Sequence, residues 1–226
     1  LRPSVDSIIG FIETDDDPRG VKGTWEGLVL IPDRSVQALF DGLRTNAAYF
    51  ESTMPWSDEY KCESPTYPMH EAWQVIAAHG DAGPDIPHGT NLPNSDTIRT
   101  NTGHRSLLFT NVIRAADEAT ESLLLDIFAP VEERTAARKC AGINSDLTLA
   151  LHEIVGHGSG QMSVKLADTS PDTYLKELAT AIEELRAELV AMTLLWDPKV
   201  RELSPLYTDE CAEAAWRSLV RRDLTM

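Results

Sequence analysis

Hydrophobic and polar residues follow different patterns in the two halves of the chain. Near the amino terminus, short runs rich in strand-forming residues lie at 8–12 and 24–31, with the turn-like sequence DDDPRG at 15–20 between them. This arrangement predicts a pair of strands. From Asp33, which can cap a helix, hydrophobic side chains recur at helical spacing as far as about Glu51 and predict one helix there.

Prolines interrupt residues 52–70, and the apolar run WQVIAAHG at 73–80 predicts one buried strand. Residues 81–94 contain several Gly and Pro, and we expect a shaped loop there. Helical periodicity predominates from residue 107 onward and predicts the following helices: 107–128, 131–139, 145–157, 172–196 and 208–223. The expected fold class is therefore α+β, with the strands in the amino-terminal half.

Composition and charge narrow the classes of function. The 226 residues, of which 42% are hydrophobic and 25% charged, suit a globular chain of one large domain or two small lobes. No apolar run reaches the roughly 18 residues of a membrane span, so we expect no membrane partner. The formal charge of −16 opposes binding to nucleic acid and is better matched to cationic substrates.

The three cysteines, Cys62, Cys140 and Cys211, are an odd number and form no CxxC spacing. This pattern predicts a reducing compartment and no disulfide framework. No leader with a charged segment followed by an apolar one is visible, so the expected location is the cytoplasm. The first residue is Leu1 rather than Met, which is typical of a piece of a longer chain.

The segment LTLALHEIVGHGSG at 147–160 carries the strongest chemical signal. Two imidazoles on one helix can bind Zn²⁺ from one side, and a glutamate beside the first, here Glu153, can take a proton from a water molecule at the metal. His152 and His157 are five positions apart, which places the second ring roughly 140° around an ideal helix. We therefore predict a π-bulge that realigns the two rings, with Gly156 where the distortion costs least.

A third protein ligand is expected from the acidic helix IEELRAE at 182–188, because a catalytic zinc site uses three protein ligands and one water. Glu184 and Glu188 lie on one face of that helix, and Glu183 points about 100° away. One of these carboxylates can bind the metal while another orients a histidine ring. Arg186 can form an ion pair with either of these carboxylates or with a substrate. A chance occurrence of the histidine motif is on the order of one in several thousand, so core histidines are a weak alternative.

Together the two motifs resemble the zinc-dependent dipeptidyl-peptidase III family, whose signatures are HExxGH and EExRAE. Here they stand as HEIVGH at 152–157 and EELRAE at 183–188. GFIETDDDPRG at 10–20 followed by GTWEG at 23–27 is similar to the family's first substrate-binding strand region, and GTNLPN at 89–94 is similar to its GINxPN loop. The resemblance covers nearly the whole chain in the family's order.

The resemblance implies a site for one Zn²⁺ per chain, held by His152, His157 and Glu184. It also implies that Glu153 is the general base, which activates a water molecule and later returns the proton to the leaving amine. Glu183 and Glu188 are then expected to orient the ligands from the second shell.

For the substrate, the resemblance implies that Glu13, Asn91 and Asn94 hold the free amino terminus of a peptide. An ammonium group needs such acceptors, and an exopeptidase must recognise the terminus. The family usually has a tyrosine two residues after the acid that matches Glu13. Here that position is Asp15, which cannot donate the same hydrogen bond when ionised.

The family fold has two lobes with a cleft between them, one built around a β-barrel and one mostly helical and zinc-binding. By resemblance, residues 1–33 and 70–106 form the β-containing, substrate-binding part, and residues 34–69 and 107–226 form the helical catalytic part. The family continues beyond both ends of this chain, so we expect a partial or reduced version of that fold.

The expected function is a zinc-dependent exopeptidase that releases dipeptides from the amino terminus of short peptides, acting as a monomer. The alternative is a catalytically silent homologue or fragment that binds zinc and peptides without turnover, which Asp15 favours and the intact Glu153 opposes. A structural zinc domain, closed by a fourth protein ligand, is the least favoured hypothesis because no suitable Cys or His lies near the motif.

Overall fold

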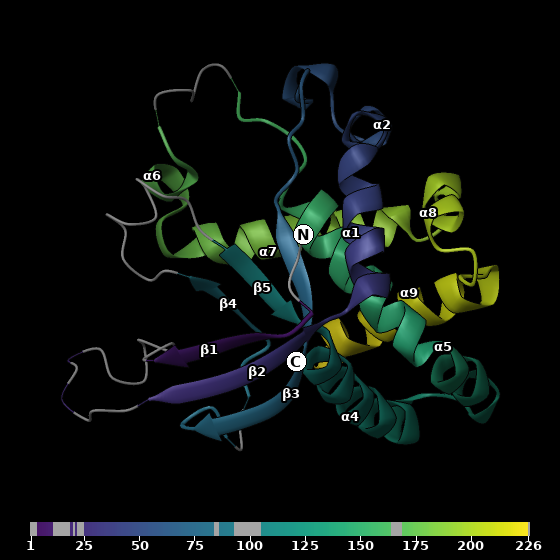
Figure 1. Cartoon of the computed structure of the whole chain (residues 1–226). Helices are drawn as coiled ribbons and strands as arrows, with labels where there is room; N and C mark the ends of the chain where they lie inside the picture. Colours follow the sequence, from purple (N-terminus) through teal and green to yellow (C-terminus); the bar gives the residue numbers. More distant parts are fainter. Residues whose placement is uncertain are drawn as a thin grey trace. The chain divides into compact units, whose positions relative to one another are not determined.

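The computed structural model describes residues 4–10, 19, 21, 25–83, 86–92, 105–163 and 169–225 (Figure 1). The chain divides into two units, one formed by residues 1–37 and 69–117 and the other by residues 38–68 and 118–226. Within the described ranges the strands belong to the first unit, and most helices belong to the second. The α+β prediction is confirmed, whereas the division into a substrate-binding and a catalytic part stays a prediction.

The described residues of the first unit form a mixed sheet of five strands in the order β1-β2-β3-β5-β4. The strands have the following bounds: β1 Asp6–Gly10, β2 Glu26–Pro32, β3 His70–Gly80, β4 Gly89–Leu92 and β5 Arg105–Phe109. Neighbouring strands are antiparallel except β3 and β5, which are parallel. The register shifts between Val29 and Leu30, which pair with Ala77 and Val75, so β3 carries one extra residue there, Ile76. Such bulges increase the local twist of a sheet.

Side chains from the sheet build the hydrophobic core of this unit. Leu28 and Leu30 are two residues apart on β2, as are Leu107 and Phe109 on β5, so each pair points to one face of the sheet. Both pairs are buried in one cluster with Trp73 of β3. Burial of each such large side chain contributes about 1.5–3 kcal/mol to folding.

Two sequence predictions are wrong in this unit. Residues 89–92, expected within a loop, form β4, and residues 107–109, expected to begin a helix, belong to β5. Each segment becomes a strand because β5 pairs with β3 on one side and with β4 on the other. Pairing between segments that are distant in the sequence overrides the local pattern.

Asp33 precedes α1 (Arg34–Thr45), and its Oδ1 accepts a hydrogen bond from the backbone N–H of Val36 at 3.2 Å. This bond satisfies a free donor at the start of the helix, as the sequence predicted. The single helix expected to reach Glu51 is instead divided at Asn46, after which α2 (Ala47–Thr53) begins. The side-chain amide of Asn46 donates to the carbonyl of Gly42 at 2.8 Å, and such local bonds compete with the helix ladder.

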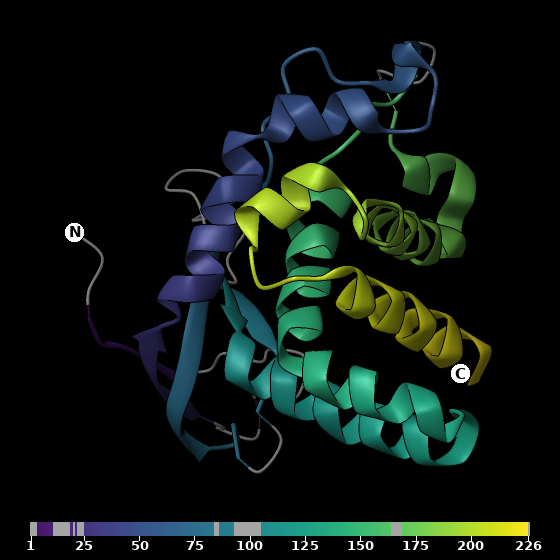
Figure 2. The same ribbon diagram turned by 90° about the vertical axis from the view of Figure 1, so that its right-hand side faces the viewer.

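The remaining helices have the following bounds: α4 Thr110–Phe128, α5 Val131–Ala150, α6 Pro171–Leu175, α7 Ala179–Leu194, α8 Pro198–Leu203 and α9 Asp209–Thr225. Short 3₁₀ turns are η1 (Asp58–Tyr60) and η4 (Lys176–Leu178), and η2 (Leu151–Gly156) is a π-helix. α5 is one helix rather than the two expected segments. The helix expected at 172–196 is divided at Lys176, which has a φ of 51°. Figure 2 shows α9 lying between α7 and α5.

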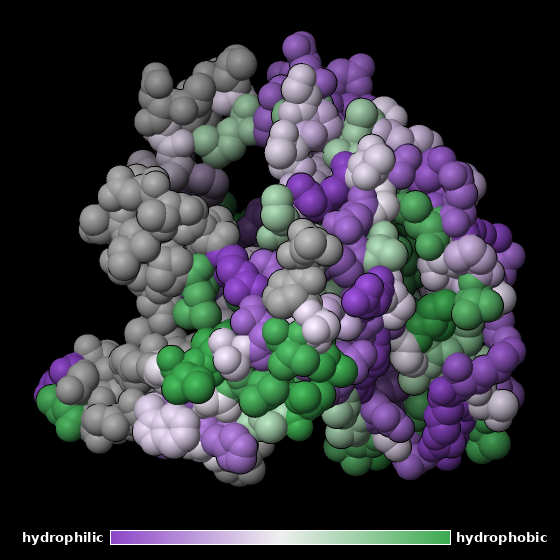
Figure 3. Space-filling model, viewed as in Figure 1, coloured by the Kyte–Doolittle hydropathy of each residue, from purple (hydrophilic) through white to green (hydrophobic). Residues whose placement is uncertain are grey.

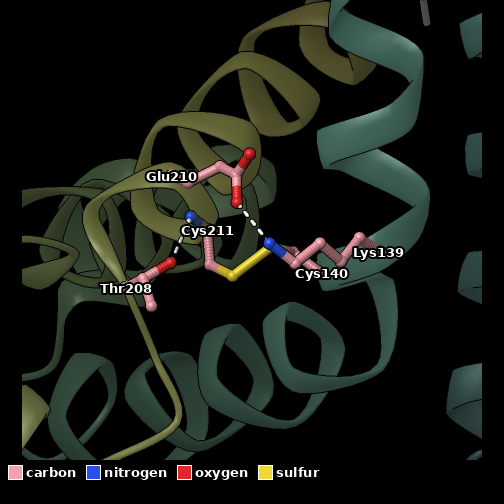
Figure 4. Close-up of a disulfide and its surroundings, with 5 residues drawn as sticks. All are labelled: Lys139, Cys140, Thr208, Glu210 and Cys211. Atoms are coloured by element: carbon pink, nitrogen blue, oxygen red, sulfur yellow. Dashed lines mark hydrogen bonds and ion pairs between the residues drawn. A yellow bond between two sulfur atoms is a disulfide. The ribbon is translucent and has the colours of Figure 1, made fainter.

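A disulfide joins Cys140 of α5 to Cys211 of α9, with the two Cα atoms 5.3 Å apart (Figure 4). The expectation of no disulfide was therefore wrong. The cysteines consequently no longer support the prediction of a reducing compartment. The cysteines are separated by 71 positions, so only the packing of α5 against α9 brings them together. An ion pair next to the disulfide also links these helices: Lys139 Nζ lies 2.7 Å from Glu210 Oε2. Cys62 is free.

The described helices include none that is long and apolar enough to cross a membrane. On the face drawn in Figure 3, hydrophilic residues predominate over the helices at the right, and hydrophobic residues lie among them in separate patches. Large hydrophobic side chains that are more than half exposed include Ile127 and Phe128 at the end of α4, and Leu185 and Leu189 on α7.

Candidate metal centre

The helix that carries the histidine motif changes its winding at the motif. α5 continues directly into the π-helix η2, and the N–H of His157 donates to the carbonyl of His152 at 3.0 Å. This bond spans five positions, as the predicted π-bulge requires, so that prediction is confirmed. The wider turn brings the two imidazoles to one side of the helix, with ring centroids 4.9 Å apart and planes at 84°.

The ring nitrogens of both histidines meet a carboxylate from α7. Glu184 Oε2 lies 3.1 Å from His152 Nε2 and 3.8 Å from His157 Nε2. One ligand atom from each of the three residues lies within 4.8 Å of the other two. Ligand atoms of a tetrahedral zinc site are separated by roughly 3.3 Å, given metal–ligand bonds of about 2.0–2.1 Å. Both distances from Glu184 Oε2 are close to this separation, so the three residues are suitable ligands for a zinc ion.

Two further carboxylates contact the opposite edges of the imidazoles. Glu188 Oε2 lies 3.2 Å from His152 Nδ1, and Glu183 Oε1 lies 3.0 Å from His157 Nδ1. In the tautomer that carries the proton on Nδ1, the imidazole donates to its neighbouring carboxylate, and Nε2 has the lone pair that can bind a metal. All five residues predicted as metal ligands or second-shell groups thus lie in one cluster. Their roles there remain a prediction.

Arg186 holds Glu183 in place. Its guanidinium donates to both oxygens of Glu183, at 2.8 and 2.5 Å, and to the carbonyl of Ser159 at 3.1 Å. Of the two partners that the sequence allowed, carboxylate or substrate, Arg186 contacts the carboxylate. The residue thereby links the acidic helix to the segment that follows His157.

Electrostatics keep the two supporting carboxylates ionised. Burial alone raises the pKa of Glu183, but hydrogen bonds from Arg186 and His157 outweigh this effect, and the net pKa is lowered. The pKa of Glu188 is lowered in the same way, because its hydrogen bond to His152 and the charge of Arg222 outweigh burial. Burial lowers the pKa of His152, yet the bond to Glu188 and the neighbouring carboxylate charges raise it overall.

The other predicted site residues are less completely described. Glu153 lies on η2 next to His152, is half-buried, and is one of the charges that raise the pKa of that histidine. Asn91 lies exposed on β4 in the first unit. Glu13 and Asn94 lie outside the described residues, so the proposed contacts to a peptide terminus remain untested.

Arg222, which was not predicted from the sequence, contacts Glu188 through its guanidinium at 2.5 Å. Arg222 lies on α9, 34 positions after Glu188 and outside both motifs. No spacing rule connects residues that belong to separate helices, so the sequence held no signal for this contact.

A cavity of about 660 Å³ borders the His157 side of the cluster. Glu183 and Arg186 line it together with the apolar side chains of Trp56, Met162 and Ile182. The indole Nε1 of Trp56 is buried and has no hydrogen-bond partner among the described residues. The volume falls within the range of small-ligand pockets.

Comparison with known proteins agrees with the motifs. The model of the family "Peptidase family M49" matches residues 1–171, which include the histidine motif. Dipeptidyl peptidase 3 of Mus musculus is 28% identical over 251 aligned positions, covering 98% of this chain and 33% of its own length. The Homo sapiens protein is 26% identical with the same coverage. This chain thus spans about a third of the length of these curated relatives.

Solved structures share the fold. Dipeptidyl-peptidase III of Caldithrix abyssi matches with a TM-score of 0.76 and 18% identity, over 98% of this chain and 43% of that one. The enzyme of Corallococcus sp. strain EGB matches with a TM-score of 0.62 and 18% identity, over 97% and 40%. The resemblance to the dipeptidyl-peptidase III family is confirmed. The family model matches well over half of the residues of this chain, so the chain belongs to peptidase family M49.

Proposed function

We propose that this chain binds one Zn²⁺ through His152, His157 and Glu184, and that it is a zinc-dependent exopeptidase releasing dipeptides from the amino terminus of short peptides. The observation that carries the proposal is the convergence of three ligand atoms within 4.8 Å. Three protein ligands leave one tetrahedral position for water, as in catalytic zinc sites. This count favours a catalytic over a closed structural site.

When bound, zinc would polarise the scissile carbonyl and increase the acidity of a water molecule. Glu153 follows His152 directly and would accept the proton of the attacking water, then return it to the leaving amine. Glu183 and Glu188 would hold the imidazoles through Nδ1. These carboxylates fix ring orientation and increase the basicity of Nε2.

The proposed substrate is a short peptide with a free amino terminus. Glu13, Asn91 and Asn94 would hold its ammonium group, by resemblance to the family, and the net charge of −16 attracts cations. The relatives named dipeptidyl peptidase 3 support this substrate class. A nucleic-acid partner is not expected with this charge. A monomeric state and a cytoplasmic location remain part of the proposal, although the disulfide removes one argument for that location.

The decisive experiment measures zinc content and the hydrolysis of a dipeptidyl-arylamide by the purified chain and by Glu153→Gln. Glu132→Gln is the matched control, because Glu132 is an exposed glutamate in the first turn of α5. We expect stoichiometric zinc in all three proteins, with hydrolysis abolished only in Glu153→Gln. Absence of zinc from the unaltered chain would refute the metal assignment.

A catalytically silent homologue is the second candidate. It is favoured by Asp15 at the position where the family usually has a tyrosine. This candidate predicts zinc and peptide binding without turnover. Bound zinc in the unaltered chain and no hydrolysis of the arylamide would therefore select it.

A further inference from the structure

Arg222 completes a chain of contacts that ends at His152 Nδ1, on the edge of the imidazole away from Glu184. Its Nη2 lies 2.5 Å from Glu188 Oε1, and the other oxygen of the same carboxylate lies 3.2 Å from His152 Nδ1. Glu188 is thus bonded on both oxygens, by an arginine on one side and an imidazole on the other. The Glu188 side chain is 16% exposed, so the bridge is largely shielded from solvent.

The contact with Arg222 fixes the position from which Glu188 can act on the histidine. Arg222 binds Oε1 of the carboxylate, and this contact leaves Oε2 directed at His152 Nδ1. A carboxylate held in this way orients the imidazole ring of a metal-binding histidine. Arg222 therefore holds Glu188 in the position that orients His152.

The position of Arg222 depends on how α9 is anchored. Cys211 and Arg222 are 11 positions apart, about three helical turns, so they lie on nearly the same side of α9. The disulfide fixes Cys211 to Cys140 of α5, and α5 runs directly into the π-helix that carries His152. The helix that supplies the arginine is thus covalently attached to the helix that supplies the histidine.

Other arginines on α9 serve a different contact. Arg217 and Arg221 both pair with Glu133 of α5, away from the metal cluster. Arg222 is the α9 arginine whose guanidinium contacts Glu188. Arg217 therefore offers a matched control: it is a charged link from α9 to α5 without a contact to the cluster.

We propose that Arg222 is a positioning residue for the metal site, acting through Glu188 to hold the imidazole of His152 in the orientation that binds zinc. This inference rests on the proposed zinc site. It extends that site to a third helix, α9, which lies outside both sequence motifs.

The test measures zinc affinity by chelator competition for the full chain and for Arg222→Met, Arg222→Lys and Arg217→Met. Methionine keeps much of the aliphatic stem and removes the charge. We expect Arg222→Met to bind zinc about 10–100-fold more weakly, the range found when outer-shell partners of metal ligands are changed. Arg222→Lys should recover part of the affinity, and Arg217→Met should match the unaltered chain.

Two further readouts separate positioning from a general loss of structure. The visible spectrum of the Co²⁺-substituted protein should change in Arg222→Met and stay unchanged in Arg217→Met, because only the former alters the ligand environment. In a Glu188→Gln background, Arg222→Met should have little additional effect, since the arginine acts through that carboxylate.

The outcomes distinguish this inference from the proposed function. Zinc affinity of Arg222→Met within about twofold of the unaltered chain, or an equal loss in Arg217→Met, would overturn the positioning role. Failure of the unaltered chain to bind zinc would instead refute the proposed metal site itself.

Discussion

Gly156 of η2 lies against Ala187 of α7 with no space for a side chain on the glycine. A Cβ added to Gly156 would lie 2.9 Å from the Cα, the Cβ and the carbonyl oxygen of Ala187. Ala187 is itself fully buried. The glycine of the histidine motif and the alanine of the acidic motif therefore form a contact between the two helices that carry the candidate ligands.

This contact predicts the effect of Gly156→Ala. The added methyl group must push η2 and α7 apart, and overpacking of this kind costs about 1–3 kcal/mol of unfolding free energy. Zinc affinity should also fall, because the histidines and Glu184 lie on the two separated helices. Urea unfolding and chelator competition measure the two effects.

The control for that substitution is Gly142→Ala on α5. Gly142 is exposed, and a Cβ added there would meet no atom within 4 Å. Alanine is preferred over glycine inside a helix, so we expect a gain of about 0.5–1 kcal/mol and unchanged zinc affinity. Equal stability of the Gly156→Ala and Gly142→Ala proteins would contradict the close packing of η2 on α7.

The disulfide gives a second prediction. Replacing Cys140 and Cys211 by alanine removes a link that closes a loop of 71 positions, and we expect a loss of about 2–4 kcal/mol in unfolding free energy. Urea unfolding with and without a reducing agent measures this contribution. The reductant should destabilise the unaltered chain and leave the double variant unchanged. Identical midpoints for the unaltered chain under both conditions would show that the bond contributes nothing.

The metal cluster could be predicted from the sequence because zinc coordination imposes its own geometry. Two histidines five positions apart can face one ion only if the helix widens, and the structure has a π-helix there. The acidic helix then had to approach within bonding distance of the rings. Local spacing and the requirement for a third ligand therefore indicated the two histidines and the acidic helix. The choice of Glu184 among the carboxylates of that helix came from the family resemblance.

Other features depend on contacts between distant segments and were missed. β4 and β5 are short, and their pairing with each other determines that they are strands. Cys140 and Cys211 meet because α5 packs on α9, and Arg222 reaches Glu188 from the same helix. The sequence pattern within one helix does not indicate these contacts, because they depend on how the helices pack against one another.

Asp33 provides a prediction of pH dependence. Its side chain is buried, and Oδ2 accepts hydrogen bonds from Thr110 at 2.8 Å and Arg114 at 2.9 Å. Burial raises the pKa of Asp33, but hydrogen bonds from Ser35, Gln74 and Thr110 outweigh burial and hold the pKa well below its usual range.

A pKa that is lower in the folded than in the unfolded chain stabilises the fold above the unfolded value of about 3.9, and this contribution declines as the pH falls below it. We expect Asp33→Asn to cost about 1.5–3 kcal/mol near pH 7, the worth of a hydrogen bond to a charged group. Urea unfolding of both proteins at about pH 7 and pH 3 should give a smaller difference at the lower pH. A difference that grows on acidification would contradict this assignment.

Glu51 anchors the segment that follows the histidine motif. Its carboxylate is buried on α2 and accepts hydrogen bonds from the backbone N–H of Cys62 at 2.8 Å and of Gly160 at 3.0 Å. Glu51→Ala removes the acceptor for both groups, and each buried donor left without a partner costs about 1–3 kcal/mol. Glu51→Gln keeps an amide oxygen that can still accept a hydrogen bond, so its loss of unfolding free energy should be smaller than that of Glu51→Ala.

The measurement is the unfolding free energy of these two variants in urea, with Glu59→Ala as control because Glu59 is exposed on η1. The expected order of stability is the unaltered chain and Glu59→Ala together, then Glu51→Gln, then Glu51→Ala. Hydrogen exchange at the Gly160 amide should accelerate most in Glu51→Ala, because that N–H loses its acceptor while the surrounding helices remain folded. Unchanged protection of this amide would show that the carboxylate does not hold the segment.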